Sequence, residues 1–363
     1  MKNSFGNSVI LTIFGESHGS AIGAVIDGLA PGIKIDEELI KSQLDLRRPF
    51  GKISTSRVEE DEFEIVSGLF EGKTTGTPLT IIIPNENTKS KDYSKTKDIA
   101  RPGHADFTAN VKYNGFQDYR GGGHFSGRIT AAVVAAGAIF KQALKAKGIL
   151  IGTHIKKLAD IEDENFNDYA SDIKKLNEMK FAVLDDEKSK EMVGKIEEAQ
   201  SEGDSVGGIL ETCILNAPLG LGEPWFDSVE SVLSHAIFAI PGIKGIEFGA
   251  GFEISNLKGS QANDAFRMNG EKIVTKTNNN GGINGGITNG MPIIFRCAVK
   301  PTPSIFKEQE SVDFKKKENV SFSLEGRHDP AIIHRARVVV DSISAFVIMD
   351  MLASKNGTDY FCD

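Results

Sequence analysis

Histidines placed beside glycine are the first sign of chemistry in this sequence. Four of the seven histidines stand next to glycine or within two residues of it, among charged neighbours: His18, His104, His124 and His328. Glycine-rich turns bring side chains and bare backbone N–H groups to clefts, and histidine titrates near neutral pH without help. A lone histidine is usually an ordinary surface or core residue, but this recurrence favours acid–base catalysis.

The arginines follow the same distribution along the chain. They stand at or beside these turns: Arg47, Arg48, Arg101, Arg120, Arg128, Arg327, Arg335 and Arg337. Solvated surface charge is the alternative interpretation. However, the chain is acidic overall, with a formal net charge of -8, and guanidinium is the preferred fork for carboxylate and phosphate. The local concentration of arginine therefore indicates a polyanionic ligand.

A run of three glycines, Gly121 to Gly123, stands between Arg120 and Arg128 and leads into a stretch of very small residues, 129–139. The first N–H groups of a helix lack intrahelical partners, and the helix dipole adds partial positive charge there. Such a turn at a helix start can bind phosphate or carboxylate. A plain loop before a buried helix is the alternative. A second glycine-rich loop, 278–290, precedes a strand and permits the same close backbone approach.

Several familiar motifs fit poorly. Residues 15–19 read G-x-S-x-G, the nucleophile elbow of serine hydrolases, but the next segment has a strand pattern instead of a helix. The glycines at 121 and 123 do not complete a dinucleotide-binding fingerprint, and neither a P-loop nor a metal-ligand spacing occurs in the sequence.

The hydrophobic pattern predicts strands and helices that must position these turns. Strands are expected at 9–14, 21–26, 63–66, 79–83, 208–215 and 293–299, and helices at 37–46, 129–139, 229–239 and 338–352. Strands do not alternate regularly with helices, and the helices are rich in Gly, Ala and Ser. This favours an α+β fold with antiparallel sheets around buried helices. A strand, turn and acid-capped helix near 24–46 and again near 209–239 suggests an internal duplication.

Composition narrows the function further. We expect one large domain over residues 1–363, with a charged helical surface excursion at 162–202. The acidic charge disfavours nucleic acid and anionic membranes as partners. Three widely spaced cysteines and the absence of a signal-like N-terminus fit a soluble cytoplasmic protein. The residues alone thus indicate an enzyme that acts on a phosphorylated, carboxylated small molecule, with the bond broken left open.

Eight sequence blocks together resemble the chorismate synthase family in order and spacing. They are GESHG at 15–19, RRP at 47–49, RPGHAD at 101–106, GDS at 203–205, GIEFG at 245–249, GGINGG at 281–286, KPT at 300–302 and GRHDP at 326–330. The resemblance implies a lyase of the shikimate pathway that eliminates phosphate from 5-enolpyruvylshikimate 3-phosphate to give chorismate. It also implies a need for reduced FMN without net redox change, a homotetramer, and a helical layer sandwiched between antiparallel sheets.

The resemblance assigns roles to individual residues. His18 would protonate the departing phosphate, His104 would protonate the reduced flavin, and Asp329 would lie near the flavin ring. Flavin contacts carry over to His124, Phe125, Ser126, Pro241, Gly242, Gly285, Lys300, Pro301, Thr302, Pro303, Ser304 and Arg327, and substrate contacts to Arg47, Arg48 and Arg337.

The chain departs from the family pattern in three places. His124-Phe125-Ser126-Gly127-Arg128 stands where the family usually has Arg-Ser-Ser-Ala-Arg, Ile53 stands where an arginine is expected, and Pro241-Gly242 replaces Asn-Ala. A flavin- or phosphate-binding protein without lyase activity is therefore the rival prediction. A serine hydrolase is a third. No separate reductase domain is visible in the sequence. Whether the chain reduces its own flavin with NADPH or depends on an outside source therefore stays open.

Overall fold

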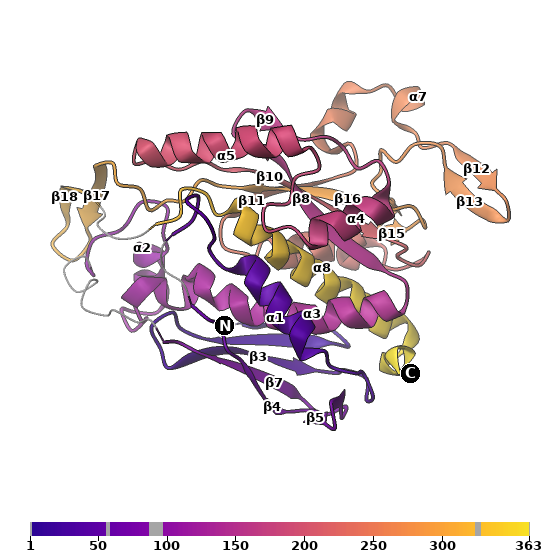
Figure 1. Ribbon diagram of the computed structural model, residues 1–363, viewed down its shortest axis with the longest axis horizontal. Helices are drawn as coiled ribbons and strands as arrows, with labels where there is room; N and C mark the ends of the chain where they lie inside the picture. The colour runs from indigo at the N-terminus through magenta and orange to yellow at the C-terminus, as the bar shows by residue number, and fades with distance from the viewer. Residues whose placement is uncertain (1, 56–58, 87–96, 324–327, 363) are drawn as a thin grey trace.

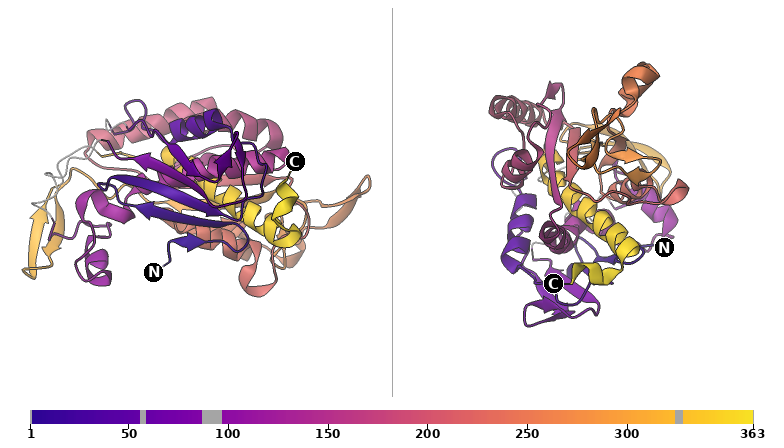
Figure 2. Two further views of the ribbon diagram at one scale, coloured as in Figure 1. Left: turned by 90° about the horizontal axis from the view of Figure 1, so that it is seen from below. Right: turned by 90° about the vertical axis from the view of Figure 1, so that its right-hand side faces the viewer.

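Two five-stranded antiparallel sheets enclose a layer of helices in this protein, for which a computed structural model describes residues 2–55, 59–86, 97–323 and 328–362 (Figures 1 and 2). The first sheet has the strand order β1-β2-β3-β7-β4: Ser4–Phe5, Ile10–Gly15, Ala21–Asp27, Leu79–Pro84 and Glu64–Ser67. The second has the order β11-β16-β10-β8-β9: Ile243–Phe248, Ile293–Val299, Gly208–Leu215, Leu150–Leu158 and Ile161–Glu162. The α+β class expected from the sequence is confirmed.

Each sheet turns one apolar face to the helices between them. In β7, Leu79, Ile81 and Ile83 are fully buried, as the two-residue period of a strand requires. In β16, every second side chain from Ile293 to Val299 is buried in the same way. The central helices are α1, α3, α6 and α8: Glu37–Arg47, Thr130–Ala146, Val229–Ile237 and Ile333–Asn356.

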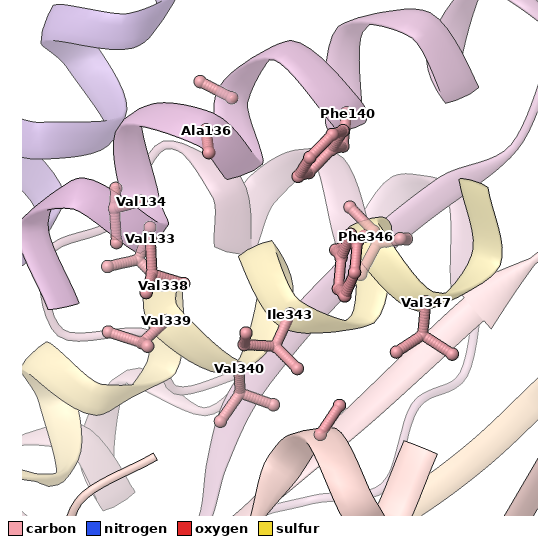
Figure 3. Packing of buried hydrophobic residues seen from close by; sticks show 14 of the residues in the cluster. Val133, Val134, Ala136, Phe140, Val338, Val339, Val340, Ile343, Phe346 and Val347 are labelled. Carbon is pink, nitrogen blue, oxygen red and sulfur yellow. The ribbon is translucent and has the colours of Figure 1, made fainter. Parts of the chain in front are cut away.

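Helices α3 and α8 pack against each other along the middle of the molecule (Figure 3). Helix α3 also contacts strands of the first sheet, and α8 contacts strands of the second. A Cβ on Gly137 of α3 would lie 2.1 Å from the Cβ of Ser342 in α8, so only glycine permits this approach. Phe140 and Phe346 pack with ring centroids 5.5 Å apart. Residues Gly127–Ala146 are apolar and long enough to cross a membrane, but 72% of the apolar window is buried in the protein, as in a core helix.

The two sheets repeat one topology. In the first, β2, β3, α1, β4, β7 and α3 follow one another along the chain, and the strands lie in the order β2-β3-β7-β4. In the second, β8, β10, α6, β11, β16 and α8 give the matching order β8-β10-β16-β11. We call these halves the first and second repeat. This repeated topology agrees with the internal duplication that the sequence suggests, although the caps differ: Asp36 caps α1, whereas Ser228 caps α6.

Insertions in the second repeat lie outside this frame. The segment 162–202 contains α4 and α5, Tyr169–Asn177 and Asp186–Ser201, and α4 packs on the outer side of β8. A two-stranded arm, β12 and β13, extends from the molecule at Phe266–Asn269 and Lys272–Thr275 (Figure 1). The remaining elements are β5 Leu69–Phe70, β6 Lys73–Thr74, α2 Asp106–Lys112, α7 Gly259–Ala262, β14 Ile283–Asn284, β15 Ile287–Thr288, β17 Gln309–Asp313 and β18 Glu318–Phe322.

Candidate active site

A cavity of about 940 Å³ lies where α3 and α8 begin. Both repeats supply its walls, through the connection that precedes α3 in the first repeat and the one that precedes α8 in the second. Most of the site residues expected from the sequence line it: Arg47, His104, His124, Phe125, Ser126, Pro241, Gly242, Lys300, Thr302, Pro303 and Asp329. The topology thus brings together motifs that are separated by as much as 280 residues.

The N-terminal ends of two helices face this cavity. Gly127 to Thr130 at the start of α3, and Ile332, Arg335 and Ala336 at the start of α8, are among its lining residues. Each helix N-terminus carries a partial positive charge of roughly half an elementary charge. Because the repeat topology directs both ends to one place, the backbone itself favours an anion there.

The glycine run forms a left-handed backbone segment beside His18. Gly121, Gly122 and Gly123 have φ angles of 58°, 84° and 53°, which strongly favour glycine. A Cβ on Gly121 would lie 2.3 Å from Cε1 of His18. The imidazole therefore packs directly behind Gly121, with 6% of the residue exposed, and its Nδ1 lies 3.2 Å from the hydroxyl of Ser17.

Ser17 does not lie on a nucleophile elbow. The turn that carries it joins β2 to β3, which pair as antiparallel neighbours, whereas the elbow of serine hydrolases leads from a strand into a helix. The backbone N–H of Ser17 donates to the carbonyl oxygen of Gly123 at 3.0 Å. The serine hydrolase interpretation therefore loses its structural context.

His104 lines the cavity beside the connection that follows β16. Its Nε2 is 2.8 Å from the hydroxyl of Ser304. Burial, followed by the charge of Arg101, lowers the pKa of His104 to about 4. The imidazole is therefore neutral at neutral pH and can donate at one ring nitrogen and accept at the other.

Two arginines from different elements share one buried carboxylate. Arg47, at the end of α1, and Arg128, just before α3, both pair with Asp61, and Arg47 also donates to the carbonyl oxygen of Gly127 at 2.9 Å. Asp61 has a left-handed φ of 53°. Burial lowers the pKa of Arg47 to about 10, which leaves it charged at neutral pH.

Asp329 and Arg335 form a second ion pair in the cavity. Nη1 of Arg335 lies 2.6 Å from Oδ2 of Asp329, and the other carboxylate oxygen accepts from the backbone N–H of Thr55 at 2.9 Å. Arg335 also donates through Nε to the carbonyl oxygen of Arg47 at 2.9 Å. The pair therefore connects α8 of the second repeat to α1 of the first.

Several predicted residues lie away from the cavity. Arg337, predicted as a substrate contact, does not line the cavity: its guanidinium is fully buried, 3.3 Å from Asp341, and donates to the carbonyl oxygen of Met179 at 2.7 Å. Gly285 is exposed in the turn between β14 and β15, near the first turn of α6, whose last turn lines the cavity. Arg48 caps the end of α1 and pairs with Asp45 at 3.8 Å.

Other predicted residues stand behind the cavity wall or outside the described part of the chain. His18 and Ser304 contact it through Ser17 and His104, whereas Pro301 is exposed. His328 packs against Phe306 with ring centroids 5.6 Å apart. Arg327 lies outside the described residues. Ile53, where the resemblance leads one to expect an arginine, is 4% exposed and belongs to the core, so it makes no polar contact.

Sequence reasoning missed the carboxylates that neutralise the arginines. Glu59 and Asp61 belong to the acidic run 59–62, which is typical of a solvated loop, yet Glu59 lies 3.7 Å from Arg128 and Asp61 is buried. Arg335 was visible among the clustered arginines, but nothing in the sequence separated it from Arg337, two residues on. Residues two positions apart in a helix point in different directions. Arg335 and Arg337 can therefore be distinguished only once the orientation of α8 is known.

The chain resembles proteins of one family over nearly its whole length. Residues 9–353 match the family model described as chorismate synthase. The chain is 46% identical over 347 residues to the chorismate synthase of Pyrococcus abyssi, with 96% of each chain covered. It is 46% identical over 359 residues to that of Dehalococcoides mccartyi, covering 97% of this chain and 96% of the relative.

A solved structure agrees with these sequence comparisons. A crystal structure of a chorismate synthase superposes with a TM-score of 0.77 at 30% sequence identity, covering 97% of this chain and 94% of that one. The fold and the cavity define an α+β protein with a large cavity that favours an anion. The chain belongs to the chorismate synthase family, and its enzyme class is that of a lyase in the shikimate route to aromatic compounds.

Proposed function

We propose that this chain converts 5-enolpyruvylshikimate 3-phosphate to chorismate and phosphate by 1,4-anti elimination, with reduced FMN as cofactor. The observation that carries the proposal is the convergence of His104 and several guanidiniums on one cavity at two helix N-termini, with His18 directly behind Gly121 in its wall. Phosphate leaves poorly unless its charge is neutralised, and these groups supply both the field and a proton.

The cavity suits a flavin beside a second small molecule. At about 940 Å³ it is at the upper end of the range for ligand sites, and Ile240, Val339 and Phe346 provide apolar wall. Two lining side chains, Gln117 and Thr302, have buried oxygen atoms without a hydrogen-bond partner among the described residues. Buried polar atoms of this kind are normally paired, so they fit a polar ligand.

Different residues of the cavity would bind the flavin and donate the proton. Phe125, Ser126, Pro241-Gly242 and Lys300 to Pro303 would hold the flavin. Reduced flavin, when bound, supplies electron density that the reaction returns, so there is no net redox change. His18, behind the bare backbone of Gly121, would give its proton to the phosphate oxygen.

His104 would act as the second proton carrier. Its neutral state in the free protein follows from burial and from the nearby charge of Arg101. A bound polyanion would offset that positive charge, which raises the pKa of the imidazole towards its ordinary value. Ser304 would keep the ring oriented through its contact with Nε2.

Anaerobic turnover tests the proposed reaction. We expect the purified chain, supplied with chemically reduced FMN and 5-enolpyruvylshikimate 3-phosphate, to release phosphate and chorismate in equal amounts. His18→Ala and His104→Ala should each lower kcat by roughly 10²-fold or more, as for removed acid catalysts, with an unchanged unfolding midpoint. Wild-type rates in either variant would refute the assigned role.

The same experiment decides the rival function. A chain that binds reduced FMN tightly yet yields no chorismate would be a flavin- or phosphate-binding protein without lyase activity. The altered sequence His124-Phe125 is the feature that favours this rival. A direct FMN titration, followed by absorbance, separates loss of binding from loss of chemistry.

We also propose a homotetramer in the cytoplasm. Large apolar side chains of the second repeat are exposed, including Trp225 at 86%, Phe226 at 90% and Phe252 at 81%, and the β12–β13 arm exposes Phe266. Apolar surface of this extent is typical of a protein interface. The three cysteines are free thiols, which fits a reducing compartment. Light scattering should give about four times the 39.3 kDa chain mass.

A further inference from the structure

We propose that His124 is a positioning residue that fixes the turn carrying His18, and this inference rests on the proposed function. Nδ1 of His124 lies 2.7 Å from the carbonyl oxygen of Gly15. A carbonyl oxygen only accepts, so Nδ1 must carry the hydrogen and donate it. His124 therefore holds the last residue of β2, directly before the turn that bears the imidazole acid.

The turn is held from two sides, and His124 is on the side that faces the cavity. From the end of β7, the amide of Asn85 donates to the carbonyl oxygens of Glu16 and Gly19, at 2.9 and 3.0 Å. From the glycine run, the N–H of Ser17 bonds to Gly123, and His124 bonds to Gly15. The bond from Ser17 to Gly123 joins two backbone groups. The bond from His124, directly after the glycine run, is the one made by a side chain.

The position of His18 depends on how closely the turn and the glycine run approach. His18 packs against the α-carbon of Gly121 with no room for a methyl group between them. His124 is three residues further along the same run, and its ring spans to the start of the turn. Loss of the hydrogen bond between His124 and Gly15 allows the turn to move away from Gly121. A displacement of about 1 Å at a catalytic group can lower the rate on the order of 10²-fold.

Side-chain geometry offers a matched pair of variants. The Nδ2 atom of asparagine is two bonds from Cβ, as is Nδ1 of histidine, so His124→Asn retains a donor near the same point. Glutamine places its donor one atom further out. We expect His124→Ala and His124→Gln to lower kcat by about 10-fold or more at saturating reduced FMN and substrate, and His124→Asn to stay within about threefold of wild type.

A double-mutant cycle shows whether the effect passes through His18. We expect His124→Ala to lower kcat about 10-fold in the wild-type chain and less than about twofold in the His18→Ala background, measured in single-turnover anaerobic reactions. A residue that acts only on the flavin would show the same loss in both backgrounds. Equal losses, or equal rates in His124→Asn and His124→Ala, would overturn the proposal.

Two further measurements distinguish the possible failures. The Kd of FMN, from absorbance titration, should change less than about threefold in His124→Ala, and a large rise that excess FMN rescues would assign His124 to flavin binding instead. A wild-type chain that produces no chorismate would refute the proposed function itself, whichever His124 variants were made. Unfolding midpoints show that the variants are folded.

Discussion

The two repeats share one strand order but use the connection between their first two strands in different ways. In the first repeat, β2 and β3 are joined by the short turn 16–20, which carries Ser17 into the cavity wall and His18 directly behind it. In the second, residues 159–207 join β8 to β10 and form two helices, one of which packs on the outer side of the sheet. The same position in the topology therefore serves chemistry in one half and packing in the other.

A buried ionic network fastens the long connection of the second repeat. His154 on β8 lies 2.7 Å from Asp163 through Nδ1 and 3.2 Å from Glu211 through Nε2. Asp163 also accepts the backbone N–H groups of Leu184 and Asp185, which lead into α5. The comparison teaches that this buried network of the second repeat lies outside the cavity lining, whereas Arg47, Asp61 and Arg128 of the first repeat form their network in it.

Replacement of His154 should lower the stability of the second repeat without changing the catalytic rate. His154→Leu removes the imidazole partner of Asp163 and one of the two cationic partners of Glu211, which keeps Arg296 at 3.2 Å. The loss of this buried partner should lower the free energy of unfolding by about 3 kcal/mol. Urea denaturation measures the loss. Because His154 does not line the cavity, kcat at a temperature where the variant is folded should stay within about twofold of wild type. A large loss of kcat would contradict this prediction, because it would show that the His154 network affects catalysis as well as stability.

The glycine run of the first repeat should show the opposite behaviour. Gly121→Ala and Gly122→Ala place an alanine at similar left-handed φ angles, which costs each about 1–2 kcal/mol of stability. Only the Cβ at 121 meets His18, because at 122 the nearest atom, in Ser126, is 3.8 Å away. We expect kcat to fall about 10- to 100-fold in Gly121→Ala and less than threefold in Gly122→Ala. Equal kcat values would contradict the packing role of Gly121.

Acid sensitivity should sharpen the contrast between the two central helices. His334 stands in the first turn of α8, whereas the sequence of α3 contains no histidine. Burial, then Arg335, lowers the pKa of His334 to about 3, so between pH 6.5 and pH 4 the unfolded chain binds more protons than the folded one. The unfolding free energy should therefore fall by about 2 kcal/mol from pH 6.5 to pH 5 on account of this residue.

Comparison with a variant isolates the contribution of His334. His334→Gln keeps a polar partner for Ser54, whose hydroxyl lies 2.8 Å from Nε2, but does not titrate. Urea denaturation at pH 6.5 and pH 5 should give a smaller decrease in unfolding free energy for the variant than for wild type. Identical decreases would mean that other groups cause the acid sensitivity.

Local patterns in the sequence predict much of the frame. The strand at 208–215 and the Asp36-capped helix appear as expected, because a two-residue period and a capping side chain are local signals. The start of α8 at Ile333, five residues before the expected position, was missed because His334 and Arg335 look like surface residues. Both are held by tertiary partners, which no local pattern shows.

The residues of the candidate site also fall into two groups, those that the sequence predicts and those that only the structure identifies. Glycine and histidine at turns identified the loops that meet, since those residue types have few other reasons to occur together. The structure was needed to separate Arg335, which faces the cavity, from Arg337, which pairs with Asp341 inside the core. Asp61 could not be found from sequence, because its burial depends on Arg47 and Arg128 arriving from two distant segments.

The pairing of Asp61 with these two guanidiniums has a consequence for selectivity. An anion that enters beside Arg47 and Arg128 meets cations that already have a counter-ion and are already stripped of most of their water. Their Coulomb attraction for any passing anion is therefore weakened, and what distinguishes one solute from another is its fit to the fixed fork geometry. Simple inorganic ions should compete poorly with an organic phosphate of the right shape.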